Sequence, residues 1–148
     1  MRRFIAEGFG VGRWPRRWWG SDSGAGTLGA LVAVVIGLFL LSAPWWIDTL
    51  VALAAIAVSI WAAQPFALDA DPGWVTIDEV AGTLVAMIGL TGWPWIIAVV
   101  VARLGDIYKV APGVKWADSR HGSVAVTLDD VIAGGYGLAL GWLLTWMI

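Results

Sequence analysis

The chain has 148 residues, of which 59% are hydrophobic and only 14% charged, and its mean hydropathy is +0.80. Soluble domains carry roughly a quarter charged residues, so this composition indicates an integral membrane protein. No cysteine is present, which excludes a disulfide scaffold, a thiolate-ligated zinc site and a cysteine nucleophile, and the single histidine, His121, excludes mechanisms that need two imidazoles. The net charge of −2 gives no general attraction for nucleic acid.

The N-terminal segment, residues 1–26, is basic and rich in tryptophan. More than twenty-five residues precede the first apolar run, whereas a secretory signal peptide has only a short basic region there. The end of the run also lacks a good cleavage site, so a signal peptide is not expected. The mixture of arginine and tryptophan between Arg13 and Trp19 is typical of a surface anchor on anionic lipid. By the positive-inside rule, the five arginines of this segment predict a cytoplasmic N-terminus: Arg2, Arg3, Arg13, Arg16 and Arg17.

The apolar runs that follow predict an all-α bundle of four to five transmembrane helices in one domain, residues 1–148. Residues 27–68 hold the first two runs, Thr27–Pro44 and Trp45–Leu68, and a bilayer crossing needs about 20 residues. Residues 69–128 hold a third run that a glycine and proline cluster interrupts at 89–94, which predicts a hairpin of two short membrane helices with flanking cytoplasmic loops. The last helix is expected from about Leu128, within residues 129–148. This topology places all nine basic residues on the cytoplasmic side.

Acidic residues gather where the predicted helices meet the cytoplasm. Threonine followed by two acids opens two of these helices, at Thr76 and Thr127, and a capping box explains the second acid of each pair but not the first. Unpaired charge is costly to bury there, and a hard cation such as Mg²⁺, which prefers oxygen ligands, would compensate it. Seven of the eleven carboxylates belong to this group: Asp69, Asp71, Asp78, Glu79, Asp106, Asp129 and Asp130.

Basic and small polar residues near these acids predict a phosphate site. Arg103, Asp106 and Lys109 are spaced three apart and share one side of a helix. Arg120 and His121 precede the second acid pair, and a guanidinium matches the geometry of phosphate. Residues 23–27 are glycine-rich and end in Thr27, which could offer backbone amides and a hydroxyl to an anion. We therefore expect phosphate binding by four residues: Arg103, Lys109, Arg120 and Thr27.

Three stretches of the chain resemble the phosphatidylglycerophosphatase A family. They are residues 71–82, residues 103–109, and His121-Gly122 followed by residues 129–134. The resemblance implies a multi-pass enzyme of the bacterial inner membrane that hydrolyses phosphatidylglycerophosphate to phosphatidylglycerol and inorganic phosphate with Mg²⁺. It also implies that eight residues stand at the family's functional positions: Asp71, Asp78, Glu79, Arg103, Asp106, Lys109, Asp129 and Asp130.

The predicted reaction is phosphomonoester hydrolysis at the cytoplasmic surface, with the acyl chains left in the bilayer. The predicted catalytic residues are Asp78, Glu79, Asp129, Asp130 and His121, the last as either a proton donor or a plain surface residue. The predicted metal ligands are Asp71, Asp78, Glu79, Asp106, Asp129 and Asp130.

The expected partners are membrane lipid and the phospholipid substrate, with no nucleic acid and no obligate protein partner. Two other classes of function remain open. A divalent-cation carrier or channel would also place acids at helix ends. A non-catalytic lipid-binding protein is the third class, for which Ala133, Gly137 and Gly141 form a small-residue stripe that is more simply internal packing than a dimer face.

Overall fold

The computed structural model describes residues 1–68 and 72–147, and these residues form helices, turns and loops with no strand. The predicted all-helical class is thus confirmed for the described part of the chain. The elements are α1 (Arg2–Ala6), the 3-10 helix η1 (Val11–Arg13), α2 (Trp14–Trp19), α3 (Ala25–Leu40), α4 (Trp45–Ala63), α5 (Ile77–Ala86), α6 (Gly92–Tyr108), α7 (Val114–Asp118) and α8 (Ser123–Trp146).

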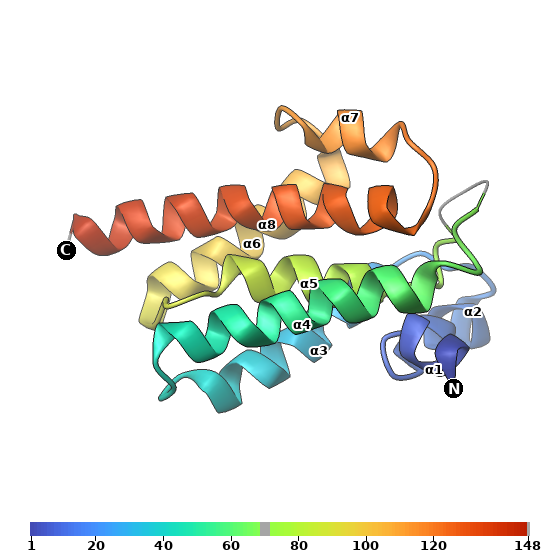
Figure 1. Ribbon diagram of the computed structural model, residues 1–148, viewed down its shortest axis with the longest axis horizontal. Helices are drawn as coiled ribbons and strands as arrows, with labels where there is room; N and C mark the ends of the chain where they lie inside the picture. Colours follow the sequence, from blue (N-terminus) through green and yellow to red (C-terminus); the bar gives the residue numbers. More distant parts are fainter. Residues whose placement is uncertain (69–71, 148) are drawn as a thin grey trace.

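The longer helices run along the long axis of the molecule and define two ends (Figure 1). We call one the polar end: it contains residues 1–24, the first turns of α5 and α8, the last turn of α6, and α7. We call the other the turn end: it contains residues 41–44, residues 87–91 and the last turn of α8. Chain segments far apart in the sequence therefore meet at the polar end.

Helix α5 lies at the centre of the bundle. Eight of its ten residues are buried, and it packs against α3, α4, α6 and α8. Glycines allow its backbone to approach α8 closely, because a β-carbon on Gly82 would collide with the carbonyl of Asp130, and one on Gly134 would collide with the carbonyl of Gly82. This contact fixes the acidic first turn of α5 against the segment of α8 that contains Asp130.

The predicted hairpin is present as α5 and α6, separated by a turn at the turn end. Gly89 and Gly92 have φ angles of +65° and +64°, a conformation that favours glycine. The amide of Gly89 donates to Asp48 Oδ2 at 2.9 Å, and the indole of Trp142 donates to the carbonyl of Ile88 at 3.2 Å. The turn is therefore held from both α4 and α8.

Two details at the helix starts differ from the sequence interpretation. Helix α8 begins at Ser123, five residues before Leu128, directly after Gly122 with its φ of +98°. Thr127 therefore lies inside the helix, where its hydroxyl bonds the carbonyl of Ser123 at 2.9 Å and the hydroxyl of Ser59 at 2.7 Å. Thr76 is the N-cap of α5, but its hydroxyl makes no capping hydrogen bond. The capping-box interpretation was wrong for Thr127 and correct only in position for Thr76.

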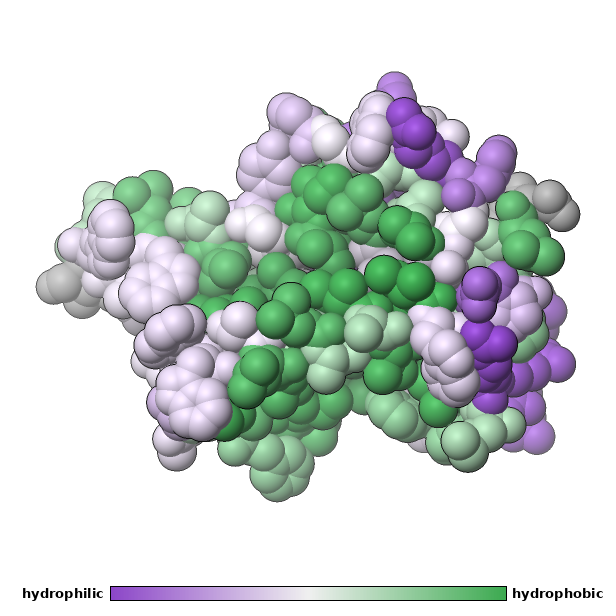
Figure 2. Space-filling view, in the orientation of Figure 1, coloured by the Kyte–Doolittle hydropathy of each residue, from purple (hydrophilic) through white to green (hydrophobic). Residues whose placement is uncertain are grey.

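The exterior of the bundle is apolar along its middle. Helices α4 and α8 are long and apolar enough to cross a membrane, whereas α3 has 16 residues, and two such helices alone give weak support for a membrane protein. Most buried apolar residues are alanines, while large side chains such as Leu31, Phe39 and Leu53 are exposed. Figure 2 shows a hydrophobic surface over the middle of the bundle and hydrophilic residues concentrated at the polar end.

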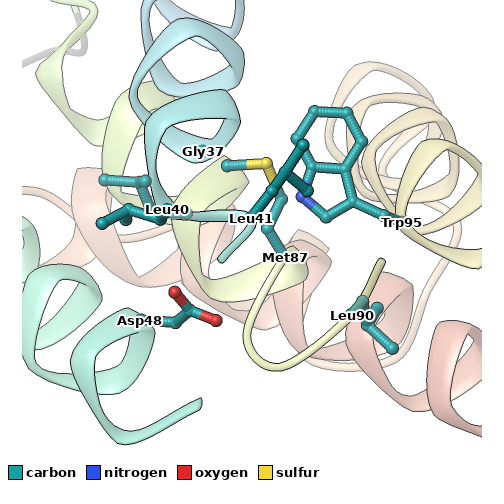
Figure 3. A pocket seen from close by; sticks show the side chains of 8 residues that line it. Gly37, Leu40, Leu41, Asp48, Met87, Leu90 and Trp95 are labelled. Carbon is teal, nitrogen blue, oxygen red and sulfur yellow. The ribbon is translucent and has the colours of Figure 1, made fainter. Parts of the chain in front are cut away.

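The turn end encloses a small cavity of about 10 Å³, about the space of one water molecule. Its lining is apolar apart from the carboxylate of Asp48 (Figure 3). The residues around it are Gly37, Leu40, Leu41, Asp48, Leu84, Met87, Leu90 and Trp95.

Candidate active site

A much larger cavity, of about 400 Å³, opens at the polar end, and we call it the acidic cavity. Four helix ends form it: the starts of α3, α5 and α8 and the end of α6. Its lining residues are Asp22, Ser23, Gly24, Gly26, Thr27, Gly73, Val75, Asp78, Glu79, Arg103, Asp106, Ile107, Lys109, Asp129 and Asp130.

Three carboxylates from three helices come together in this cavity. One oxygen each from Glu79, Asp106 and Asp130 lies within 4.8 Å of the other two. Oxygen ligands on opposite sides of Mg²⁺ are about 4 Å apart, because each metal–oxygen distance is about 2.1 Å. The chemistry of these donors therefore suits a divalent cation, and their spacing is close to what one ion requires.

The guanidinium of Arg103 lies among the same three carboxylates. Its Nη1 forms ion pairs with Glu79, with Asp106 at 2.8 Å and with Asp130 at 3.8 Å. The side chain is only 15% exposed, so these pairs are screened less by water than surface pairs are. Arg103 is thus the cation that holds the three helix ends together.

Lys109 occupies the other side of the cavity, at the C-cap of α6. Its backbone is left-handed, with φ 52° and ψ 31°, which costs a residue with a side chain about 1 kcal/mol. The ammonium lies 2.5 Å from Asp129 Oδ2, 3.0 Å from Asp118 and 3.2 Å from Asp106. Burial would lower the pKa of Lys109, but the hydrogen bond to Asp129 and the charges of Asp106 and Asp129 outweigh it and raise the pKa well above its usual value. Lys109 is therefore a fixed positive charge.

The two acid pairs are arranged in the same way. The first acid of each pair accepts a hydrogen bond from the next backbone amide, at 2.9 Å from Glu79 N to Asp78 Oδ1 and at 3.0 Å from Asp130 N to Asp129 Oδ1. The second acid of each pair, Glu79 or Asp130, joins the carboxylate cluster around Arg103. Adjacent positions differ by about 100° around a helix, so the two acids of a pair reach different partners: Asp130 lies near Arg103, whereas Asp129 pairs with Lys109.

The start of α3 forms the wall opposite the acids. A β-carbon on Gly26 would collide with the carboxylate of Glu79 and lie 3.0 Å from Arg103 Nη2, so only glycine fits there without a shift. Thr27 lines the cavity with an exposed side chain, as the phosphate-site prediction requires. Asp22 and Gly73 also line the cavity, and the sequence analysis missed both. A β-carbon added to Gly73 would lie 3.2 Å from that of Asp22, but no local sequence pattern links these two loops.

Two of the predicted site residues lie outside the lining of the cavity. His121 and Arg120 are exposed and absent from its lining. The guanidinium of Arg120 instead lies 4.2 Å from the ring centroid of Trp116. The early start of α8 explains this, because two helical turns separate His121 from Asp129. Asp71 lies outside the described residues.

Known proteins match nearly the whole chain. The family model described as phosphatidylglycerophosphatase A matches residues 4–145. The chain is 29% identical over 137 residues to phosphatidylglycerophosphatase A of Escherichia coli (strain K12), covering 88% of this chain and 75% of the relative. It is 34% identical over 157 residues to a putative phosphatidylinositol-3-phosphatase of Bacteroides thetaiotaomicron, covering 97% and 93%. No solved structure matches.

The family match includes every helix end that forms the acidic cavity, and therefore the carboxylate cluster, Arg103 and Lys109. The chain belongs to the phosphatidylglycerophosphatase A family and is a phosphatase that acts on a phosphomonoester.

Proposed function

We propose that this phosphatase hydrolyses phosphatidylglycerophosphate to phosphatidylglycerol and inorganic phosphate, with Mg²⁺, at the cytoplasmic face of a bacterial inner membrane. The observation that carries the proposal is the charge arrangement in the acidic cavity. Five carboxylates of α5, α6 and α8 face one space with two cations, Arg103 and Lys109. Such a site can take a divalent cation together with a phosphate group.

The membrane placement rests on the apolar exterior and the distribution of arginines. We infer that the bundle is embedded as a multi-pass protein with the polar end in the cytoplasm, because the arginine-rich residues 1–24 lie at that end. Small residues inside and large apolar residues outside are typical of helices that pack within lipid. A lipid headgroup would then reach the acidic cavity while its acyl chains stay in the bilayer.

The metal would be held by Glu79, Asp106 and Asp130, whose oxygens already converge, with Asp78 and Asp129 in the same cavity. When bound, Mg²⁺ supplies Lewis-acid stabilisation of the charge on the phosphoryl oxygens.

The protein's own residues position the phosphate and move protons. Arg103 and Lys109 bind the non-bridging oxygens and stabilise their charge in the transition state. Thr27 and the backbone at Gly26 face the same space from α3. A cavity carboxylate accepts a proton from the water that attacks phosphorus, and it gives this proton to the glycerol oxygen as the bond from that oxygen to phosphorus breaks. His121 lies outside the lining, so the proposal assigns it no role.

The decisive measurement is phosphate release by the purified full chain in detergent micelles. We expect release from phosphatidylglycerophosphate with Mg²⁺, loss of release with a chelator, and recovery when Mg²⁺ is restored. Phosphatidylinositol 3-phosphate should be tested in parallel, because a relative carries a phosphatidylinositol-3-phosphatase name. Faster release from that lipid would overturn the substrate assignment.

The two other functional classes would give different results with the same purified protein. Uptake of divalent cations into liposomes without phosphate release would indicate a carrier or channel. Lipid binding with neither uptake nor release would indicate a non-catalytic protein. Either outcome would overturn the proposed reaction.

A further inference from the structure

A second cavity, of about 150 Å³, lies at the polar end, and we call it the arginine pocket. It is lined by Arg3, Arg13, Arg16, Arg17, Asp22 and Trp74. Asp22 also lines the acidic cavity, so the two cavities share a wall. The residues come from α1, η1, α2 and the loops before α3 and α5, and the proposed hydrolysis uses only Asp22 among them, as a wall residue.

The pocket has an excess of positive charge among the described residues. Asp22 accepts from Arg16 at 2.6 Å. Glu7, which is completely buried, pairs with Arg3 at 2.9 Å and with Arg13 at 2.5 Å. Four guanidiniums thus face two described carboxylates, and Arg17 forms no ion pair with any carboxylate in residues 1–68 or 72–147.

The arginines are held in place by the fold rather than displayed on a loose tail. The amide of Thr76 donates to the carbonyl of Ala6 at 2.8 Å, which attaches α1 to the start of α5. A β-carbon on Gly12 would collide with the carbonyl of Trp74, so η1 also packs directly on this segment. The guanidinium of Arg3 lies 5.1 Å from the ring centroid of Trp74. The backbone of α1 and η1, which carries Arg3 and Arg13, is therefore fixed against the segment before α5.

Exposed tryptophans adjoin the pocket on α2. The ring centroids of Trp14 and Trp18 are 5.6 Å apart, and those of Trp18 and Trp19 are 5.9 Å apart, with all three side chains exposed. Tryptophan is enriched at the depth of lipid headgroups, where its ring is apolar and its N–H is wet. The arginine pocket would thus lie at the level of lipid phosphates.

We propose that the arginine pocket binds the phosphate of an anionic phospholipid that is separate from the lipid being hydrolysed. A guanidinium can bind two phosphate oxygens at once through charge-assisted hydrogen bonds. A zwitterionic lipid carries an ammonium group of its own, which the arginines would repel. The shared wall at Asp22 places this lipid beside the substrate headgroup. Free inorganic phosphate has the same oxygen chemistry, so the test must separate the two sources.

The test measures lipid retention by native mass spectrometry on the full chain in neutral detergent. Short-chain phosphatidylglycerol, phosphatidylcholine of equal chain length and inorganic phosphate are titrated separately. We expect phosphatidylglycerol to bind in preference to both, and Arg17→Gln to weaken it by about tenfold, the loss of one charged hydrogen bond. Lys115→Gln removes one exposed positive charge of α7, outside the pocket, and serves as the matched control.

Three results would overturn the proposal. Equal affinities of the Arg17→Gln and Lys115→Gln variants would show general electrostatic attraction instead of a site. Inorganic phosphate binding as tightly as the lipid would assign the pocket to the free anion. Loss of phosphatidylglycerol in an Asp129→Asn variant would place the lipid in the acidic cavity. None of these results depends on whether phosphatidylglycerophosphate is hydrolysed, so failure here is distinguishable from failure of the proposed function.

Discussion

Both ends of the bundle contain carboxylates that are shielded from bulk water, but the negative charge is compensated differently at the two ends. At the turn end a single acid, Asp48, accepts the amide of Gly89 at 2.9 Å beside a cavity of about 10 Å³. At the polar end five carboxylates of three helices share a cavity of about 400 Å³ with two cations. Asp48 accepts a hydrogen bond from the turn that it stabilises, whereas the five carboxylates at the polar end outnumber the two cations in their cavity.

This is the contrast expected between a carboxylate with a structural role and the carboxylates of the proposed site. Burying an unpaired charge costs several kcal/mol, so a fold that only needed stability would gain from neutral residues at most of these five positions. A cavity wide enough for a phosphate group and lined by excess negative charge is instead suited to a cation that arrives with its ligand. Substitutions at the two ends should therefore affect different measurements.

The largest effect is expected from Asp129→Asn at the polar end. Turnover should fall by at least about a hundredfold, because the amide removes a charge that orients Lys109 and faces the phosphate. Phosphate release is the measurement, with helix content by circular dichroism to verify folding. Asp118→Asn is the matched control: Asp118 also contacts Lys109, at 3.0 Å, but its side chain is 45% exposed and outside the cavity lining, so the loss should be less than tenfold. Near-normal turnover of Asp129→Asn would remove this residue from the site.

A smaller loss, about tenfold in kcat/KM, is expected from Gly26→Ala. The added methyl group would displace the carboxylate of Glu79 and the guanidinium of Arg103, and misplaced catalytic groups lose rate even when the fold persists. Gly135→Ala adds the same group to α8 where no heavy atom lies within 4 Å, so its activity should be unchanged. Equal activities of the two variants would show that the wall at α3 is not in contact with the reacting groups.

At the turn end, Asp48→Ala should lower stability and leave kcat unchanged. The amide of Gly89 would lose its acceptor, which costs about 1–3 kcal/mol. Thermal unfolding in detergent and phosphate release, measured on the same sample, test both halves of this expectation. A large fall in kcat with unchanged stability would contradict the division between the two ends.

The smallest effect is expected from Ser59→Ala, four residues before the last residue of α4. Ser59 and Thr127 form a buried hydroxyl pair at 2.7 Å, but Thr127 keeps its bond to the carbonyl of Ser123. We expect a loss of about 1 kcal/mol in stability and full activity. A change in activity would mean that the pairing of α4 with α8 controls the position of Asp129.

Much of the polar end could be predicted because its signals are local. The doubled acids at 78–79 and 129–130 and the three-residue spacing of Arg103, Asp106 and Lys109 each belong to one helix, and the structure brings them into one cavity. The glycine and proline cluster likewise marked the turn between α5 and α6. Helical periodicity also predicted that one acid of each pair would turn toward neighbouring helices, and Glu79 and Asp130 do so in the cluster around Arg103.

Features that depend on contacts between distant segments were not predictable. The position of Thr127 inside α8 follows from Gly122 and from Ser59 on another helix, whereas its local sequence is typical of a helix cap. The arginine pocket needs Trp74 beside α1 and η1, and no periodic pattern encodes that contact. His121 precedes the second acid pair in the sequence but is absent from the cavity lining, because α8 starts earlier than its composition indicates.

The hydrogen bond from Thr76 to Ala6 also has a consequence for biosynthesis. Ala6 leaves the ribosome seventy residues before its partner, so α1 has no docking place until α3 and α4 have been made. Contacts between such distant positions form late, since the intervening loop must close first. The newly made chain therefore cannot form the arginine pocket until Trp74 has been made, and the acidic cavity has to wait longer, for Asp129 and Asp130 of α8.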